Sequence, residues 1–185
     1  FILSDAYIGQ MMEPVNISGP VLHGACKDWA VRGDAATRKN LITSIHMSPS
    51  LQRKHNEELQ SVYRQVASEL VDFESFGTED AQVVFVAYGI VSRICRSAVH
   101  QLREMGIKAG MLRLKTVYPF PDEEIARLVD AGKHLIAVEL SNGQMANDVS
   151  LAAGNRSSVS RHLTMGGETP SVEQLVSFAV QRSAR

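Results

Sequence analysis

Hydrophobic positions in the second half of the chain form short continuous runs that alternate with helical periods. The run VVFVAYG, residues 83–89, is continuous and rich in β-branched and aromatic residues, as expected for a strand covered on both faces. Similar runs cover residues 109–114 and HLIAVEL at 134–140. Apolar residues between these runs, at 91–102 and 125–129, recur at helical spacing. The pattern predicts parallel strands joined by right-handed helical crossovers.

Three further elements complete this part of the chain. Asn142 and Gly143 turn the chain into another predicted helix, and Val159 to Leu163 is a weaker strand candidate. Ser171 with Gln174 resembles a capping box that opens a terminal helix. Together the elements predict one α/β domain over residues 77–185, with a doubly wound, mainly parallel sheet in a three-layer arrangement.

The first 76 residues follow a different pattern. Apolar residues from Leu51 to Phe73 recur mostly at helical spacing with charged residues between them, which predicts a long amphipathic helix over about 50–73. Its apolar stripe could pack within this chain, the favoured interpretation, or on another chain. Glycine and proline interrupt residues 16–49, so we interpret residues 16–76 as a connector that contains this helix.

The beginning of the chain predicts a strand at Phe1 to Leu3 and a turn in which Ser4 and Asp5 are helix N-cap types. A short helix follows and ends before Pro14. Because the chain starts with Phe1 rather than Met, we expect it to be a piece of a longer protein.

Composition excludes several classes of protein. A formal net charge of −1 in 185 residues gives no basic field that would neutralise phosphates, so we expect no nucleic-acid partner. The apolar runs are too short to span a bilayer, so we expect no membrane association and a cytoplasmic location. Cys26 and Cys95 form no CxxC motif, so we expect any iron–sulfur cluster to lie in a partner. His23 and Cys26 are spaced like half a zinc site whose other half is absent, and we predict no metal ligands.

Three segments carry a resemblance to a known family: SDAYIGQMMEPV, VAYGIVSRICRSAVHQLREMGIKAGMLRLKTVYPFP and AVELSNGQMANDV. In order and separation they resemble the α subunit of the 2-oxoacid:ferredoxin oxidoreductases. The resemblance implies that residues 1–15 are the tail of a domain that holds the pyrimidine side of thiamine diphosphate. It also implies that residues 77–185 form a domain similar to the transketolase C-terminal domain.

The same resemblance implies a reaction and its components. The reaction is the oxidative decarboxylation of a 2-oxoacid to an acyl-CoA, with electrons passed to ferredoxin. Thiamine diphosphate, Mg²⁺ and 4Fe-4S clusters are implied for the full complex and none is expected on this chain alone, which we predict to be inactive. The implied partners are a β subunit and an iron–sulfur subunit, with CoA and ferredoxin used by the whole complex.

One position departs from the usual sequence of the family, and two other features indicate a subclass within it. Members of the family often have Arg-Pro where this chain has Arg113 and Leu114. The segment from Trp29 to Gly33 and the long helix favour the branched-chain subclass, whose substrate is 3-methyl-2-oxobutanoate (ketoisovalerate).

Gly89 is a candidate for cofactor or anion binding. It follows the first strand of the domain, and the helix after it would offer backbone N–H groups, with Ser92 and Arg93 close by. A single glycine is neither GxGxxG nor a P-loop, so a structural turn is the favoured interpretation.

Several residues are candidates for an interface rather than for catalysis, and we predict no catalytic residue. Glu139 ends the third strand, with Gln144 in the loop after it, and we interpret Glu139 as an interface or loop-ordering carboxylate. Phe120 lies between two prolines, and we interpret it as part of a fixed turn that fills an apolar pocket. The other candidates lie on the short first helix, where adjacent methionines suggest adaptable packing: Tyr7, Gln10, Met11 and Met12.

Two alternatives remain open at this point. One is the β subunit of a lipoamide-coupled 2-oxoacid dehydrogenase, which shares the C-terminal architecture, although the PFP turn and the GQM segment argue against it. The other is a free-standing anion- or nucleotide-binding module that uses the Gly89 turn.

Overall fold

A computed structural model describes residues 1–14, 16, 19, 24, 27–154 and 159–183. His23 and Cys26, which are spaced like half a zinc site, lie outside the described residues. The chain forms two compact units. The first comprises Phe1–Met11 and Gln65–Arg185, and the second comprises Met12–Arg64.

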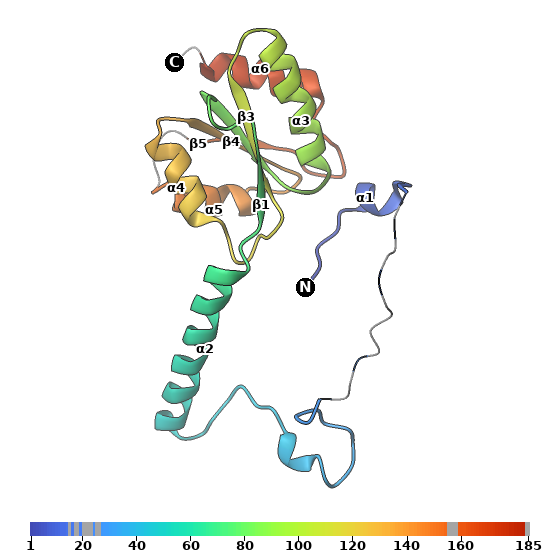
Figure 1. Cartoon of the computed structure of the whole chain (residues 1–185), viewed down its shortest axis with the longest axis vertical. Helices are drawn as coiled ribbons and strands as arrows, with labels where there is room; N and C mark the ends of the chain where they lie inside the picture. The colour runs from blue at the N-terminus through green and yellow to red at the C-terminus, as the bar shows by residue number, and fades with distance from the viewer. Residues whose placement is uncertain (15, 17–18, 20–23, 25–26, 155–158, 184–185) are drawn as a thin grey trace. The chain divides into compact units, whose positions relative to one another are not determined.

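The first unit is built on a five-stranded sheet with the order β1-β3-β2-β4-β5 (Figure 1). Strands β2 to β5 run parallel, and β1 pairs antiparallel with β3 at one edge. In the central register, Phe85 lies opposite Met111 on one side and Ile136 on the other. The strands are β1 (Phe73–Phe76), β2 (Val83–Ala87), β3 (Ala109–Leu114), β4 (His134–Glu139) and β5 (Val159–Leu163).

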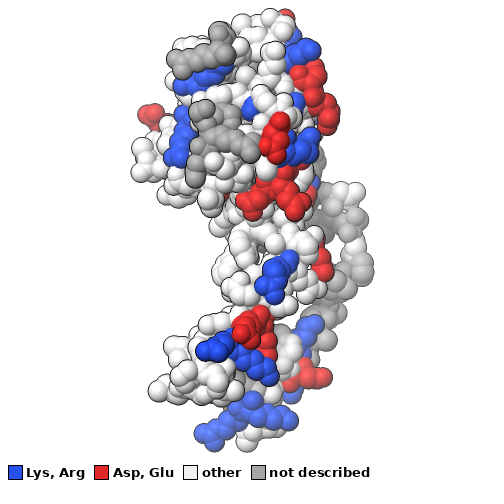
Figure 2. Space-filling model, turned by 90° about the vertical axis from the view of Figure 1, so that its left-hand side faces the viewer, with Lys and Arg blue, Asp and Glu red and all other residues white. Residues whose placement is uncertain are grey.

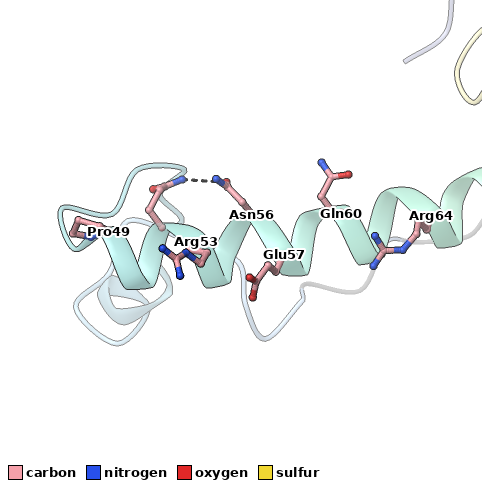
Figure 3. Close-up of a pocket in the computed structure, with 7 residues that line it drawn as sticks. Pro49, Arg53, Asn56, Glu57, Gln60 and Arg64 are labelled. Atoms are coloured by element: carbon pink, nitrogen blue, oxygen red, sulfur yellow. Dashed lines mark hydrogen bonds between the residues drawn. The ribbon is translucent and has the colours of Figure 1, made fainter.

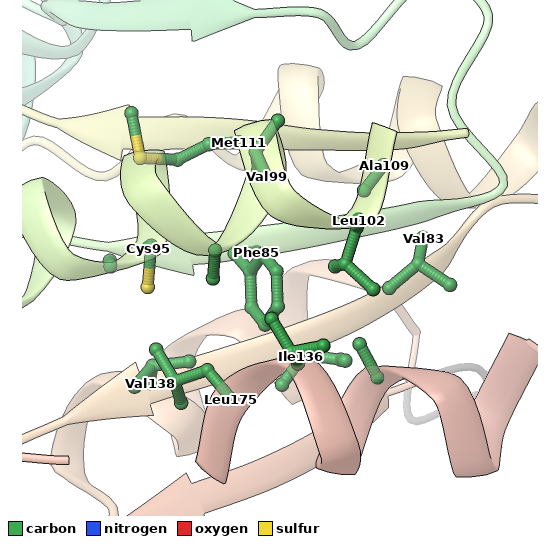
Figure 4. Close-up of a cluster of buried hydrophobic side chains, with 14 of the residues drawn as sticks. Val83, Phe85, Cys95, Val99, Leu102, Ala109, Met111, Ile136, Val138 and Leu175 are labelled. Carbon is green, nitrogen blue, oxygen red and sulfur yellow. The ribbon is translucent and has the colours of Figure 1, made fainter. Parts of the chain in front are cut away.

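Helices cover both faces of the sheet. On one face α3 (Gly89–Glu104) and α6 (Val172–Ser183) pack over a cluster centred on Phe85, part of which Figure 4 shows. On the other face α4 (Asp122–Asp130) and α5 (Gln144–Ala152) pack over a second apolar cluster. Every residue of β2 is buried, as its continuous apolar sequence requires. The predicted doubly wound, mainly parallel, three-layer α/β fold is confirmed.

Two predicted elements differ in the structure: the long helix ends earlier, and the strand at the start of the chain is absent. The long helix α2 spans Pro49–Glu69 and ends before Phe73. Phe73 instead begins β1, because it pairs with Leu114 of β3, a contact that helical spacing cannot reveal. The sheet therefore starts before residue 77. Phe1 to Leu3 are exposed and form no strand. A strand needs a neighbouring strand to pair its backbone N–H and C=O groups, and three apolar residues do not supply one.

The predicted short first helix is present as α1 (Ala6–Gln10), although it ends earlier than expected. Asp5 is its N-cap, and the Asp5 side chain accepts a hydrogen bond from the backbone of Ile8. In the second unit one short 3-10 helix spans Arg38–Asn40.

Helix α2 has no buried residue in the described structure. Leu51 and Val62 of its apolar stripe remain 56% and 52% exposed. Packing of this stripe within the chain or on another chain stays a prediction. The described part of the second unit also contributes no residue to the buried hydrophobic core.

Candidate functional site

The carboxyl ends of β2 and β4 form the candidate site. The two strands are neighbours in the sheet, but the chain leaves β2 for α3 on one face and leaves β4 for α5 on the other. Such a switch of direction is where open α/β sheets usually bind ligands. We call this place the carboxyl edge and define it as residues 88–90 and 139–143.

Glu139 ends β4 and is only 1% exposed. One carboxylate oxygen accepts from Ser141 Oγ at 2.8 Å and from the Met145 N–H at 3.0 Å, and the other accepts from the Ala146 N–H at 3.2 Å. Glu139 therefore caps the first turn of α5. Gly143, at the N-cap position with φ of +100°, has no side chain to do so.

The first turn of α3 already holds a carboxylate of this chain. Asp5 Oδ2 accepts from the Ile90 N–H at 2.9 Å, and Ser92 Oγ donates to the Gly89 carbonyl at 2.7 Å. Gly89 has a φ of +59°, and a Cβ on it would lie 2.5 Å from Asp5 Oδ2. Anion binding by Gly89, Ser92 and Arg93 stays a prediction, and another anion at the Ile90 amide would compete with Asp5.

Two arginines follow on α3. Arg93 is exposed. Arg96 forms an ion pair with Glu74 of β1 at 3.3 Å, and its guanidinium lies 4.5 Å from the centre of the Phe76 ring. Arg96 is therefore held against the edge strand of the sheet.

Tyr88 interacts electrostatically with both carboxylates. Burial raises the pKa of the Tyr88 phenol, and the negative charges of Glu139 and Asp5 act in the same direction. A hydrogen bond with Ser141 opposes this shift. The phenol thus stays protonated at neutral pH and can donate a hydrogen bond at the carboxyl edge. Tyr88 was not among the residues that the sequence pattern singled out, although it is the next-to-last residue of the run VVFVAYG.

The interface candidates from the first helix lie on the surface of their respective units. Tyr7 is 44% exposed, and its hydroxyl donates to the Gly167 carbonyl at 2.7 Å. Gln10 and Met11 are exposed in the first unit, and Met12 is exposed in the second. Their interface roles stay predictions.

The remaining interface candidates differ in exposure. Gln144 is exposed, whereas Phe120 is partly buried against the apolar cluster beneath α4 and α5. Glu139 is buried and bonded to its own loop, so its loop-ordering role has a direct structural counterpart. An interface role for these three residues also stays a prediction.

Two other concave surfaces offer less chemistry. One follows α2 alone and is lined by polar side chains that include Arg53, Glu57 and Arg64, with Gln52 bonded to Asn56 (Figure 3). The other lies between β5 and α6. It is lined by His162, Glu173, Gln174, Ser177, Phe178 and Gln181.

The described residues offer no group of three or more His, Cys, Asp or Glu side chains that could hold a metal ion. Nor does any helix among them have the length and apolar character needed to cross a membrane. On the face drawn in Figure 2, acidic and basic side chains are interspersed. At the carboxyl edge, two carboxylates therefore accept hydrogen bonds from backbone N–H groups, and one protonated phenol can donate a hydrogen bond. The described residues there supply no set of metal ligands.

Comparison with known proteins decides the family. Residues 81–175, just over half of the chain, match the profile described as pyruvate:ferredoxin oxidoreductase core domain II. The chain belongs to the 2-oxoacid:ferredoxin oxidoreductase family. This confirms the resemblance drawn from its three sequence segments.

Two relatives are similar over most of this chain. Ketoisovalerate oxidoreductase subunit VorB of Methanothermobacter marburgensis is 44% identical over 156 residues, which are 84% of this chain and 44% of the relative. The 2-oxoglutarate synthase subunit KorA of Methanocaldococcus jannaschii is 33% identical over 129 residues, or 70% of this chain and 34% of the relative. The chain thus spans less than half the length of either relative.

A solved structure shares the fold. It is the 2-oxoglutarate:ferredoxin oxidoreductase from Magnetococcus marinus with 2-oxoglutarate, coenzyme A and succinyl-CoA bound. The match has a TM-score of 0.59 at 21% identity and covers 76% of this chain and 24% of the other.

Proposed function

We propose that this chain acts within a 2-oxoacid:ferredoxin oxidoreductase of the EC 1.2.7 class, as the part of the α subunit that bears the domain at residues 77–185. The complete enzyme would decarboxylate a 2-oxoacid oxidatively to an acyl-CoA and reduce ferredoxin. The observation that carries the proposal is the match of residues 81–175 to a core domain of this family, which covers the whole carboxyl edge.

We infer 3-methyl-2-oxobutanoate as the substrate of the complete enzyme. The support is the higher identity to the ketoisovalerate oxidoreductase subunit, 44%, than to the 2-oxoglutarate synthase subunit, 33%. The weak preference of the Trp29 to Gly33 segment and the long helix points to the same subclass.

The role of this chain would be structural rather than catalytic. Glu139 and Asp5 both accept hydrogen bonds from backbone N–H groups of this chain, which supports a structural role for these carboxylates. The described residues also lack a ligand set for Mg²⁺ or for an iron–sulfur cluster. Our proposal places thiamine diphosphate, Mg²⁺ and the 4Fe-4S clusters in other parts of the enzyme.

Subunit contact is the second part of this role. Large apolar side chains of the second unit remain exposed, among them Trp29 at 63%, Leu41 at 78% and Met47 at 96%. Exposed apolar surface of this kind is typical of an interface. We propose the β subunit and the iron–sulfur subunit as the partners, with residues 1–15 as the tail of the thiamine-binding domain and residues 16–76 as the connector.

Calorimetry tests the structural role. Titration of thiamine diphosphate with Mg²⁺ into the 185-residue chain should release no binding heat, whereas titration into the assembled complex should. Micromolar binding by the chain alone would contradict the proposal that the cofactor is held elsewhere.

A further inference from the structure

The segment Phe1–Met11, here called the strap, contacts the rest of its unit mainly through polar groups. None of the residues of α1 within it is buried. Asp5 bonds to the Ile90 amide, 85 residues away in sequence, and Tyr7 bonds to the Gly167 carbonyl, 160 residues away. The strap is therefore held by a few specific hydrogen bonds rather than by a shared hydrophobic core.

The Asp5 carboxylate serves two helices at once. Its Oδ1 accepts from the Ile8 N–H at 2.8 Å in the strap, and its Oδ2 accepts from the Ile90 N–H at 2.9 Å in α3. Both acceptors lie where helix dipoles favour a negative charge. One side chain thus caps α1 and also joins the strap to the first turn of α3.

Gly89 makes this approach possible. A Cβ there would lie 2.5 Å from Asp5 Oδ2, closer than such atoms can approach without movement. The backbone of Gly89 has a positive φ of +59°, which a glycine adopts without strain. The glycine therefore matters for its missing side chain as well as for its conformation.

We propose that Asp5 is a positioning residue whose paired hydrogen bonds, here called the clamp, fix the strap at the carboxyl edge. The consequence for catalysis rests on the proposed function, in which residues 1–15 end the thiamine-binding domain. The clamp would then fix the end of that domain against the domain at residues 77–185. Asp5 would act through this placement and would not contact substrate.

Substitutions of Asp5 separate the clamp from simple helix capping. Asn caps helices about as well as Asp, but it has one acceptor oxygen where Asp has two. In the 185-residue chain, Asp5→Asn should keep the Ile8 amide protected from hydrogen exchange and speed exchange at Ile90 about tenfold or more. Asp5→Ala should speed exchange at both amides.

Ser4→Ala is the matched control for these variants. The Ser4 hydroxyl is exposed and, among the described residues, bonds only the neighbouring carbonyl of Asp5, at 3.4 Å, so exchange at Ile8 and Ile90 should not change. Ile90 exchange that stays at the original rate in Asp5→Ala would overturn the clamp.

A pair of glycine substitutions tests the close approach. Gly89→Ala and Gly132→Ala both place a side chain at a positive φ, +59° and +76°, but a Cβ on Gly132 has no atom within 4 Å. Gly89→Ala should therefore displace the strap, whereas Gly132→Ala should carry the backbone strain alone. Chymotrypsin cleavage after Tyr7, followed by mass spectrometry, should be about tenfold faster in Gly89→Ala only. Equal cleavage in both variants would overturn the inference.

The assembled enzyme tests the link to catalysis. Asp5→Asn should lower the rate of 2-oxoacid oxidation while the variant complex still assembles, and Ser4→Ala should leave the rate unchanged. A fully active Asp5→Asn complex with fast Ile90 exchange would overturn the catalytic consequence of the clamp. An original complex without any 2-oxoacid oxidation would instead overturn the proposed function and leave the exchange results to decide on the clamp.

Discussion

Removal of the Glu139 carboxylate should destabilise the first unit strongly. Glu139→Ala would leave the Met145 and Ala146 N–H groups, both buried, without their acceptor. Each buried donor left unsatisfied costs about 1–3 kcal/mol, so we expect a loss of roughly 2–6 kcal/mol in the free energy of unfolding. Glu139→Gln keeps one acceptor oxygen and should cost about 1–3 kcal/mol. Small domains are stable by only about 5–15 kcal/mol, so the larger loss is a substantial fraction of the total.

Urea unfolding followed by far-UV circular dichroism measures this loss. Trp29, the single tryptophan of the chain, lies in the second unit, so its fluorescence should not shift in step with the circular dichroism transition. Glu104→Gln removes an exposed carboxylate at the end of α3 and should change stability by less than about 0.5 kcal/mol. A Glu139→Ala protein as stable as this control would refute the capping role of Glu139.

Three further predictions concern other buried or paired groups. Burial, with a smaller effect from Arg182, lowers the folded-state pKa of His134 and His162 below the unfolded value of 6.5. As pH falls below about 6.5, the unfolded chain therefore binds more protons than the folded chain, and the urea midpoint of unfolding should drop. The drop should be smaller in His134→Gln. Urea midpoints that do not depend on pH would contradict this prediction. Arg103→Met removes the donors to the Gly77 and Ala109 carbonyls, each bonded at 2.7 Å. This change should lower the free energy of unfolding by about 1–3 kcal/mol. An unchanged urea midpoint would refute the role of Arg103. Cys95 is buried, and burial raises the pKa of its thiol well above the ordinary value. Iodoacetamide should therefore label Cys95 only in urea, which mass spectrometry of the Cys95 peptide can show. Labelling of the folded protein would contradict the burial of Cys95.

Elements that depend on local pattern could be predicted from the sequence. The strand Ala109–Leu114 was predicted with its observed bounds, because its apolar residues are buried over nearly its whole length. The capping box was also correct, since Ser171 N donates to Gln174 Oε1 at 2.8 Å and Gln174 N donates to Ser171 Oγ at 3.2 Å. Both features are specified by residues close together in the chain.

Elements that depend on distant residues could not be predicted. β1 exists because Phe73–Phe76 pairs with β3, which lies well downstream, whereas Phe73 taken alone continues the apolar period of α2. Asp5 could be recognised as an N-cap type, but its second partner, the Ile90 amide, is 85 residues away. A loop-ordering role for Glu139 was one of two interpretations. In the structure the Glu139 carboxylate accepts hydrogen bonds from the Met145 and Ala146 N–H groups, because Gly143 at the N-cap position of α5 has no side chain that could do so.

Activity of the assembled enzyme tests the central claim most directly. The complex should be purified through an affinity tag on this chain and assayed for viologen reduction with 3-methyl-2-oxobutanoate, 2-oxoglutarate and pyruvate, with and without CoA. The account predicts CoA-dependent reduction that is fastest with 3-methyl-2-oxobutanoate. Faster reduction with another of these 2-oxoacids would contradict the inferred substrate, and a purified complex that oxidises none of them would contradict the proposed function itself.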